Sequence, residues 1–232
     1  MIDIDGLFSV GDSHSAFFGQ SGLTQCHWTG AIGKATIYQA LKQGLDIFNL
    51  REEIINSEHS KECGFMKWQT NNDVYNVPDI QKDSTVIFVF GYNDIQKNIN
   101  KYHKEYPEPA IYDLIADYVK LVDRYDVKKV ICTIPPNPIK PLSEEGHKGL
   151  YNHGICRDFE VHGSSEDRRK YTLYANDLLR KLCREYDIKI LDLYSDISDN
   201  GYIKKEYTTD YVHLDYSNKE LVKLIRDKIM LI

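Results

Sequence analysis

The sequence contains no apolar run that approaches the ~20 residues of a membrane-spanning helix. It also shows no signal peptide, because the first presumed strand follows Met1 too closely for a charged region, an apolar region and a cleavage site to precede it. From these two absences we expect a cytoplasmic protein without a membrane span.

Positive charge is not in excess. Lysine and arginine number 29 against 35 aspartate and glutamate residues, and the formal net charge is -6. An acidic field without a basic cluster disfavours a polyanionic partner. We therefore expect no nucleic-acid partner, and we interpret the paired lysines at 128–129 and 204–205 as solvated surface.

Cysteine is scarce and irregularly spaced. The chain has five cysteines, an odd number, and no Cys-x-x-Cys pair, so neither a complete disulfide framework nor a zinc finger is suggested. Cys132 and Cys183 lie inside apolar patterns, and we expect both to be buried thiols.

Apolar runs of strand length alternate with apolar residues at helical spacing. The runs expected as later strands are 23–28, 85–90, 127–134 and 188–193. The segments expected as helices are 34–45, 110–125, 166–186 and 217–232. Right-handed crossovers between such strands predict an α/β fold, a three-layer α/β/α sandwich around a parallel sheet of about five strands.

The length of 232 residues suits one compact unit, and we expect a single domain over 1–232. The stretch at about 135–165 begins with a proline-rich run and has little periodicity. Its length is unusual for a plain connection, so we predict a lid or a substrate-binding loop there.

The first chemical signal is Gly-Asp-Ser-His at 11–14, which directly follows an apolar run. A strand that ends in such a bend before a helix places N–H groups and a hydroxyl at the carboxyl edge of a sheet, where open α/β folds bind ligands. Ser13 is therefore a candidate nucleophile, and Asp12 is expected to accept a hydrogen bond from the turn backbone.

Three further motifs follow in order, and the set resembles the SGNH hydrolases, also called GDSL-type esterases. They are Gly-Lys-Ala-Thr at 33–36, Gly-Tyr-Asn-Asp at 91–94 and Asp-Tyr-Val-His at 210–213. The resemblance extends over most of the chain and implies the flavodoxin-like fold of that family. His14 stands in place of the leucine of the common form, which points to the GDSH variants and leaves the substrate class open.

The resemblance implies a catalytic triad. Ser13 would attack as the nucleophile, His213 would act as the base, and Asp210 would orient the histidine and stabilise its charged form. A carboxylate three residues before a histidine can reach its Nδ1–H and leave Nε2 facing the serine. Asp215 is the reserve candidate for the orienting carboxylate.

The same resemblance implies an oxyanion hole. Its donors would be the backbone N–H groups of Ser13 and Gly33 and the side-chain amide of Asn93. Gly30 lies close enough in the sequence to serve in place of Gly33, and both choices stay open.

Together these features predict a serine esterase or acetylesterase that forms an acyl-enzyme and needs no cofactor or metal. The resemblance suggests small acyl esters or acylated carbohydrates as substrates, and the oligomeric state is left undetermined. One alternative is a dinuclear metallophosphoesterase with Asp12 and His14 as ligands, although that site needs more late histidines than His213. The other is a non-catalytic, glycan-binding domain of the same fold.

Overall fold

The computed structural model describes residues 6–57, 77–137, 163–208 and 213–232. Its centre is a five-stranded sheet in the order β2-β1-β3-β4-β5, and every neighbouring pair is parallel. The strands are β1 (Leu7–Gly11), β2 (Gln25–Trp28), β3 (Thr85–Val89), β4 (Lys128–Cys132) and β5 (Lys189–Leu191). The predicted α/β class and parallel sheet are therefore confirmed.

The strand order reverses between β1 and β3. The chain runs from β1 outward to β2, then returns past β1 to add β3, β4 and β5. Open α/β sheets bind their ligands beyond the carboxyl ends of the strands at such a reversal. Because Gly11 is paired with Val89, the segments that follow β1 and β3 leave the sheet at the same edge.

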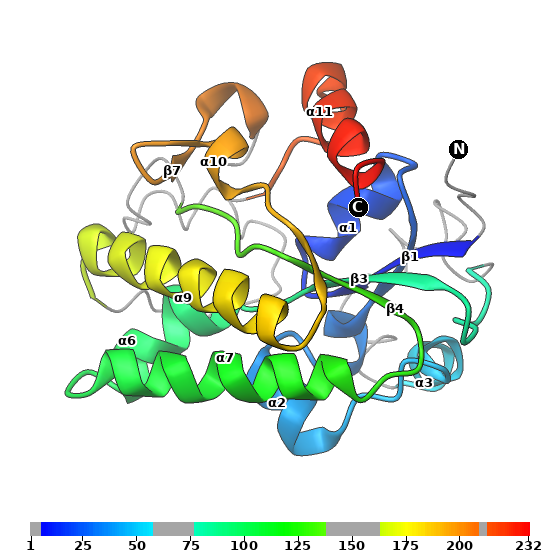
Figure 1. Ribbon diagram of the computed structural model, residues 1–232, viewed down its shortest axis with the longest axis horizontal. Helices are drawn as coiled ribbons and strands as arrows, with labels where there is room; N and C mark the ends of the chain where they lie inside the picture. The colour runs from blue at the N-terminus through cyan, green and yellow to red at the C-terminus, as the bar shows by residue number, and fades with distance from the viewer. Residues whose placement is uncertain (1–5, 58–76, 138–162, 209–212) are drawn as a thin grey trace.

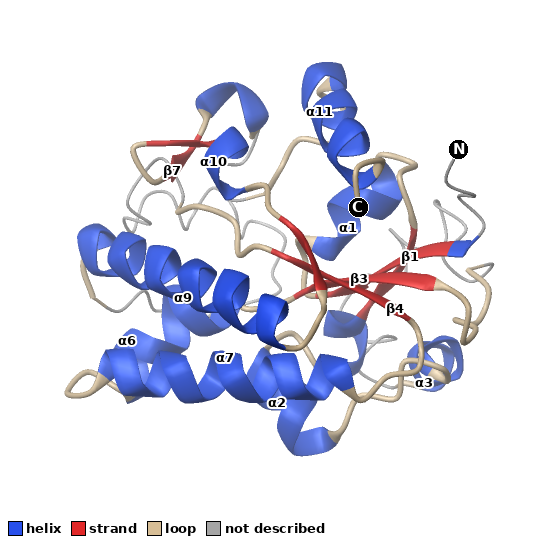
Figure 2. Cartoon of the chain, in the orientation of Figure 1, coloured by secondary structure: helices blue, strands red, loops and turns tan. Residues whose placement is uncertain are grey.

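Helices cover both faces of the sheet (Figure 1). One face carries α2 (Ile37–Gln43), α3 (Leu50–Asn56), α7 (Pro107–Asp123) and α9 (Ser165–Glu185). The other face carries α1 (Ser15–Gln20) and α11 (Lys219–Ile229). Figure 2 shows the strands lying between these two layers, which is the predicted three-layer sandwich.

Alternate residues of the central strands enter two separate cores. Phe8 and Val10 of β1 pack with Phe88 of β3 on the side of α7 and α9. Leu7 of β1 and Ile87 of β3 pack on the side of α1 and α11. A strand that is apolar on both faces is what a parallel sheet covered on both sides requires.

Local sequence sets the beginnings of the main helices. The backbone N–H of Gln39 donates to Thr36 Oγ1 at 3.0 Å ahead of α2. Ser164 and Asp167 form a capping box at the start of α9, and Pro107 stands in the first turn of α7. These three helices begin within a few residues of their predicted first residues, and so does α11.

Some elements were not predicted. A π-helix, η4 (Asp94–Asn98), follows the 91–94 motif and continues into α6 (Ile99–Tyr102). A short hairpin joins β6 (Ser198–Asp199) to β7 (Tyr202–Ile203). Its central residues, Asn200 and Gly201, have φ angles of 50° and 84°, as a tight hairpin turn of matching twist requires.

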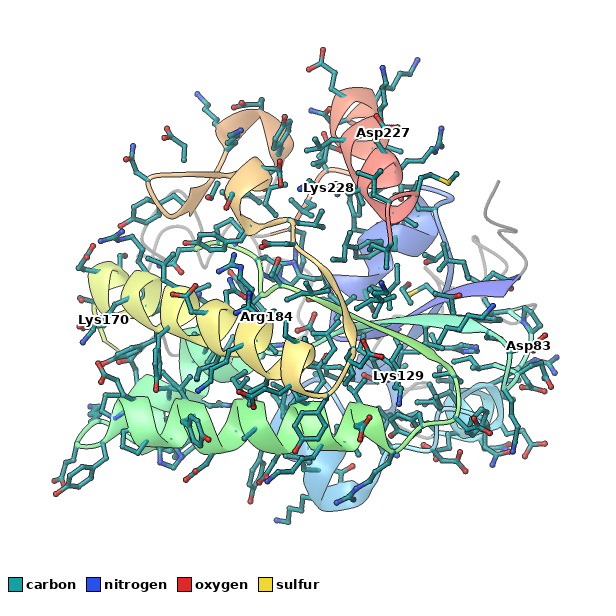
Figure 3. All side chains as sticks on the ribbon, in the orientation of Figure 1. Asp83, Lys129, Lys170, Arg184, Asp227 and Lys228 are labelled. Carbon is teal, nitrogen blue, oxygen red and sulfur yellow. The ribbon has the colours of Figure 1, made fainter. Side chains whose placement is uncertain are left out.

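The C-terminal helix is fastened to the rest of the fold by Lys228, which Figure 3 shows between α11 and α10 (Tyr194–Ile197). Its Nζ lies 2.7 Å from Asp196 Oδ2 and donates to the carbonyl oxygen of Asp192 at 3.1 Å. Both side chains of this ion pair keep about a third of their surface exposed, so the pair adds only modestly to the stability of the fold.

Cys132 and Cys183 are buried free thiols, as predicted. Most of the segment predicted as a lid, 138–162, lies outside the described residues, so that prediction stays one. Over the described part of the chain, no helix combines the length and apolarity that crossing a membrane requires.

Candidate active site

Ser13 stands two residues beyond β1, at the reversal point of the sheet. The backbone of this turn is held tightly, because Asp12 N donates to Val89 O at 3.0 Å. Gly11 allows this close approach, since a Cβ at that position would lie 1.9 Å from Val89 O. The half-buried Ser13 side chain is thus fixed at the carboxyl edge of two central strands.

His213 meets Ser13 across the fold, although the two residues are 200 positions apart in the chain. The distance between His213 Nε2 and Ser13 Oγ is 3.0 Å. This is the reach a general base needs to take a hydroxyl proton. The residues at 211–212 and the predicted orienter Asp210 lie outside the described residues, so its role stays a prediction.

Asp215, the reserve orienter, is engaged in the turn before α11. Its Oδ1 accepts hydrogen bonds from Ser217 N at 2.9 Å and from Ser217 Oγ at 2.6 Å. Its backbone N–H donates to Tyr207 O at 2.8 Å. These contacts give Asp215 a structural task in the segment that carries His213.

The carboxyl group of Asp12 is buried beneath the serine turn. Its Oδ1 accepts the backbone N–H of His14 at 2.9 Å, as predicted, and Oδ2 has no hydrogen-bond partner among the described residues. Burial raises the pKa of Asp12 to about 7; the His14 N–H lowers it, and the nearby Asp94 carboxyl raises it. A proton can therefore be held beneath the site near neutral pH.

Asn93 and Asp94 follow β3 and tie the site to α2. Asn93 Nδ2 donates to Ala35 O at 3.1 Å. Asp94 accepts from Ile37 N at 2.8 Å and from Tyr38 N at 3.4 Å, at the start of α2. Burial raises the pKa of Asp94 to about 6, and the two N–H groups lower it. The predicted role of Asn93 as an oxyanion donor stays a prediction.

Gly33 lies at the end of the short helix η2 (Thr29–Ile32) with a φ of 72°, in the left-handed region. Its backbone N–H donates to Gly30 O at 3.1 Å. To donate to a substrate oxyanion, this N–H must exchange or share that partner. Gly30 itself packs against Trp28, since a Cβ there would lie 2.3 Å from the indole ring. Either glycine as an oxyanion donor stays a prediction.

Sequence reasoning gave His14 a role only as a ligand in the alternative metal site, and the structure buries its side chain beside His213. Its ring centroid lies 5.1 Å from that of His213 and 4.2 Å from that of Tyr92. The ring of His213 is therefore supported on one side by the histidine of the 11–14 motif. The only sequence signal was the departure from leucine at that position.

A buried polar network holds η4 in place, and it too had no sequence signal. Gln96 Nε2 donates to Asn137 Oδ1 at 2.7 Å and to Thr172 Oγ1 at 2.9 Å. Asn137 follows β4 and Thr172 lies on α9. This network fixes the backbone just beyond Asn93. A π-helix at such a position often marks a functional site.

A cavity of about 1130 Å³ opens beside Asn93, between α2, the η4–α6 segment and α7. Its rim includes Tyr38, Tyr102 and Tyr106. Tyr102 and Tyr106 are close neighbours in the sequence, and the fold adds Tyr38 from α2. Over the described ranges, no three His, Cys, Asp or Glu side chains gather where they could hold a metal ion.

No protein-family model matches the chain, and no curated protein matches its sequence. Solved structures do align with it. A GDSL-like lipase from Bacteroides thetaiotaomicron is 16% identical with a TM-score of 0.50, over 98% of this chain and 89% of the lipase. A Streptococcus pneumonia protein named for platelet activating factor is 13% identical with a TM-score of 0.51, over 99% and 85% of the two chains. At these identities the likeness establishes the fold alone, and this fold is the one predicted from the resemblance.

Proposed function

We propose that this protein is a serine-dependent hydrolase of carboxylic esters. The observation that carries the proposal is the 3.0 Å approach of His213 Nε2 to Ser13 Oγ at the reversal point of the sheet. A serine hydroxyl stays protonated at neutral pH and needs such a base to attack a carbonyl. The GDSL-like lipase with the same fold supports the assignment to ester chemistry.

The reaction follows from this geometry. Ser13 Oγ forms a bond to the acyl carbon while His213 Nε2 takes the hydroxyl proton. The resulting oxyanion is stabilised by N–H donors, for which Ser13 N, Gly33 N and Asn93 Nδ2 are proposed. The tetrahedral intermediate then expels the alcohol, which receives the proton from His213 and leaves Ser13 acylated.

Water completes the cycle. His213 takes a proton from water as the oxygen attacks the acyl-enzyme, and returns it to Ser13 Oγ as the acid leaves. Asp210 is proposed to accept a hydrogen bond from His213 Nδ1–H and stabilise the imidazolium in both halves. No step calls for a cofactor. The proposed substrates are small acyl esters and acylated carbohydrates.

The test is hydrolysis of p-nitrophenyl acetate by the purified protein and by Ser13→Ala. We expect turnover by the wild type and none above background by the variant, with circular dichroism unchanged. Ser21→Ala is the matched control, because Ser21 Oγ only donates to Phe18 O at the end of α1. Full activity of a folded Ser13→Ala protein would overturn the proposal.

A further inference from the structure

The cavity beside the candidate active site has an unusual rim. Five tyrosines of the described chain are largely exposed, and three of them, Tyr38, Tyr102 and Tyr106, line this one hollow. Their exposed fractions are 58%, 66% and 71%. We call this hollow the tyrosine cleft. Single exposed aromatic rings are ordinary on protein surfaces, whereas a cluster of them marks a binding surface.

The tyrosine cleft meets the proposed catalytic edge at Asn93. Asn93 and Ala35, which share a 3.1 Å hydrogen bond, both line it. Asn93 follows β3, the strand paired with the one that delivers Ser13. A ligand in the cleft therefore reaches toward the proposed oxyanion site from the side of α2 and α7.

The chemistry of the walls narrows the ligand. Asp113 and Asp117 line the α7 side, and Asn98 and Lys97 come from η4. These groups offer hydrogen bonds to hydroxyls and lie among apolar lining residues, so the wall is mixed, whereas an acyl chain prefers a continuous apolar lining. Lys97 lines the cleft together with the two carboxyl groups, and two more lysines lie beside the rim tyrosines, so the walls carry both signs of charge and suit a ligand without net charge.

Flat amphipathic rings combined with hydroxyl-binding groups suit one class of ligand. A sugar ring has apolar C–H faces that stack on an aromatic ring and an edge of hydroxyls that bond to carboxylates and amides. Lys42 Nζ lies 5.8 Å from the Tyr38 ring centroid, and Lys101 Nζ lies 5.4 Å from that of Tyr102. A bound sugar displaces these two lysine side chains or stacks on the opposite face of each ring.

We propose that the tyrosine cleft binds the neutral carbohydrate part of an ester whose acyl group is presented to Ser13. This inference rests on the proposed esterase function for the identity of the reacting bond. The carbohydrate binding itself depends only on the cleft. The volume of about 1130 Å³ exceeds that of a usual small-molecule pocket, roughly 300–1000 Å³, and admits more than one sugar ring.

The first experiment compares a small and a large substrate. Tyr102→Ala and Tyr106→Ala are assayed on p-nitrophenyl acetate and on a panel of partially acetylated xylo-, cello-, manno- and chito-oligosaccharides. We expect kcat/KM for the best oligosaccharide to fall roughly 3- to 10-fold in each variant, mainly through KM, and p-nitrophenyl acetate to change by less than about twofold. Tyr112→Ala is the matched control, since Tyr112 is exposed on α7 but does not line the cleft.

The second experiment separates this inference from the proposed function. Ser13→Ala protein is titrated with the same unmodified and acetylated oligosaccharides by calorimetry, alone and combined with Tyr102→Ala/Tyr106→Ala. We expect binding that weakens at least about tenfold in the combined variant. If the wild type hydrolyses p-nitrophenyl acetate but no oligosaccharide binds, the inference about the cleft is wrong and the proposed esterase function stands. If oligosaccharides bind but the wild type hydrolyses no ester, the esterase function is wrong and the cleft inference stands. If binding is the same with and without the two tyrosine substitutions, the cleft inference is wrong.

Discussion

Ser13 and His213 lie side by side, but a central strand positions Ser13 and a loop positions His213. Ser13 follows a buried central strand, and its turn is bonded to Val89 O and to Ser15, whose Oγ donates to Asp12 O at 2.7 Å. His213 lies in a half-buried segment whose next residue, Leu214, forms an isolated antiparallel bridge with Thr208. The proposed nucleophile directly follows a strand of the sheet, whereas the proposed base is supplied by a loop.

This difference predicts which substitutions separate activity from stability. On the serine side, a side chain added at Gly11 would meet Val89 O and disturb backbone that the whole fold depends on, whereas Ser13→Ala removes only a side-chain oxygen. A change of His213 touches a side chain on a loop and leaves both cores intact. Catalysis should therefore be removable from the base side at little cost to the free energy of unfolding.

The largest expected effect is that of His213→Ala. Without the base, Ser13 Oγ keeps its proton, and we expect kcat for p-nitrophenyl acetate to fall by roughly 10⁴-fold or more. The thermal midpoint should stay within about 3 °C of the wild type, because His213 lies on a loop and belongs to neither hydrophobic core. A loss of activity that accompanies global unfolding would contradict the separation of the two sides.

An intermediate effect is expected for Asn93→Ala, on the side of β3. If Asn93 donates to the oxyanion, kcat should fall about 100- to 1000-fold while KM moves little. Asn56→Ala, an exposed asparagine at the end of α3, is the control. A change confined to KM would show that Asn93 only binds substrate or braces Ala35.

The smallest effect concerns stability and the buried Asp12. Its pKa in the folded state, about 7, lies above the unfolded value of 3.8, so the folded protein keeps a proton that the unfolded chain has released. Stability should therefore fall as the pH rises through that window, and Asp94, with a pKa of about 6, acts in the same direction.

Asp12→Asn should flatten this dependence. We expect the decline of the free energy of unfolding between pH 5 and pH 8 to shrink by on the order of 2 kcal/mol in urea denaturation. Asp83→Asn, at an exposed position on the periphery, is the control and should keep the wild-type slope (Figure 3). An unchanged slope in Asp12→Asn would show that Asp12 is charged throughout.

The parallel sheet could be predicted because its central strands are apolar on both faces and end at glycine or proline, whereas the order of its strands, and with it the reversal point, comes from the structure. The same pattern put Ser13 and Asn93 at one edge. The nearness of His213 could not come from periodicity, since its segment has none, and it rested on the resemblance of the motif order. Asp210 and most of the 135–165 segment lie outside the described residues.

Other features depend on packing that no sequence pattern encodes. The π-helix after Asn93 is fixed by the contacts of Gln96 with Asn137 and Thr172, residues far apart in the chain. The pKa of Asp12 follows from its burial against Asp94, and burial is a property of the fold. Tyr38 likewise joins Tyr102 and Tyr106 at one cleft only when α2 packs beside the segment that connects α6 to α7.

The central claim is that Ser13 is a nucleophile activated by His213. Its most direct test is covalent labelling with a fluorophosphonate, followed by proteolysis and mass spectrometry of wild type, Ser13→Ala and His213→Ala. We predict one label per chain on the peptide that contains Ser13, none in Ser13→Ala, and a labelling rate reduced at least about 100-fold in His213→Ala. Labelling of Ser13→Ala at the wild-type rate, or on another residue, would contradict the claim.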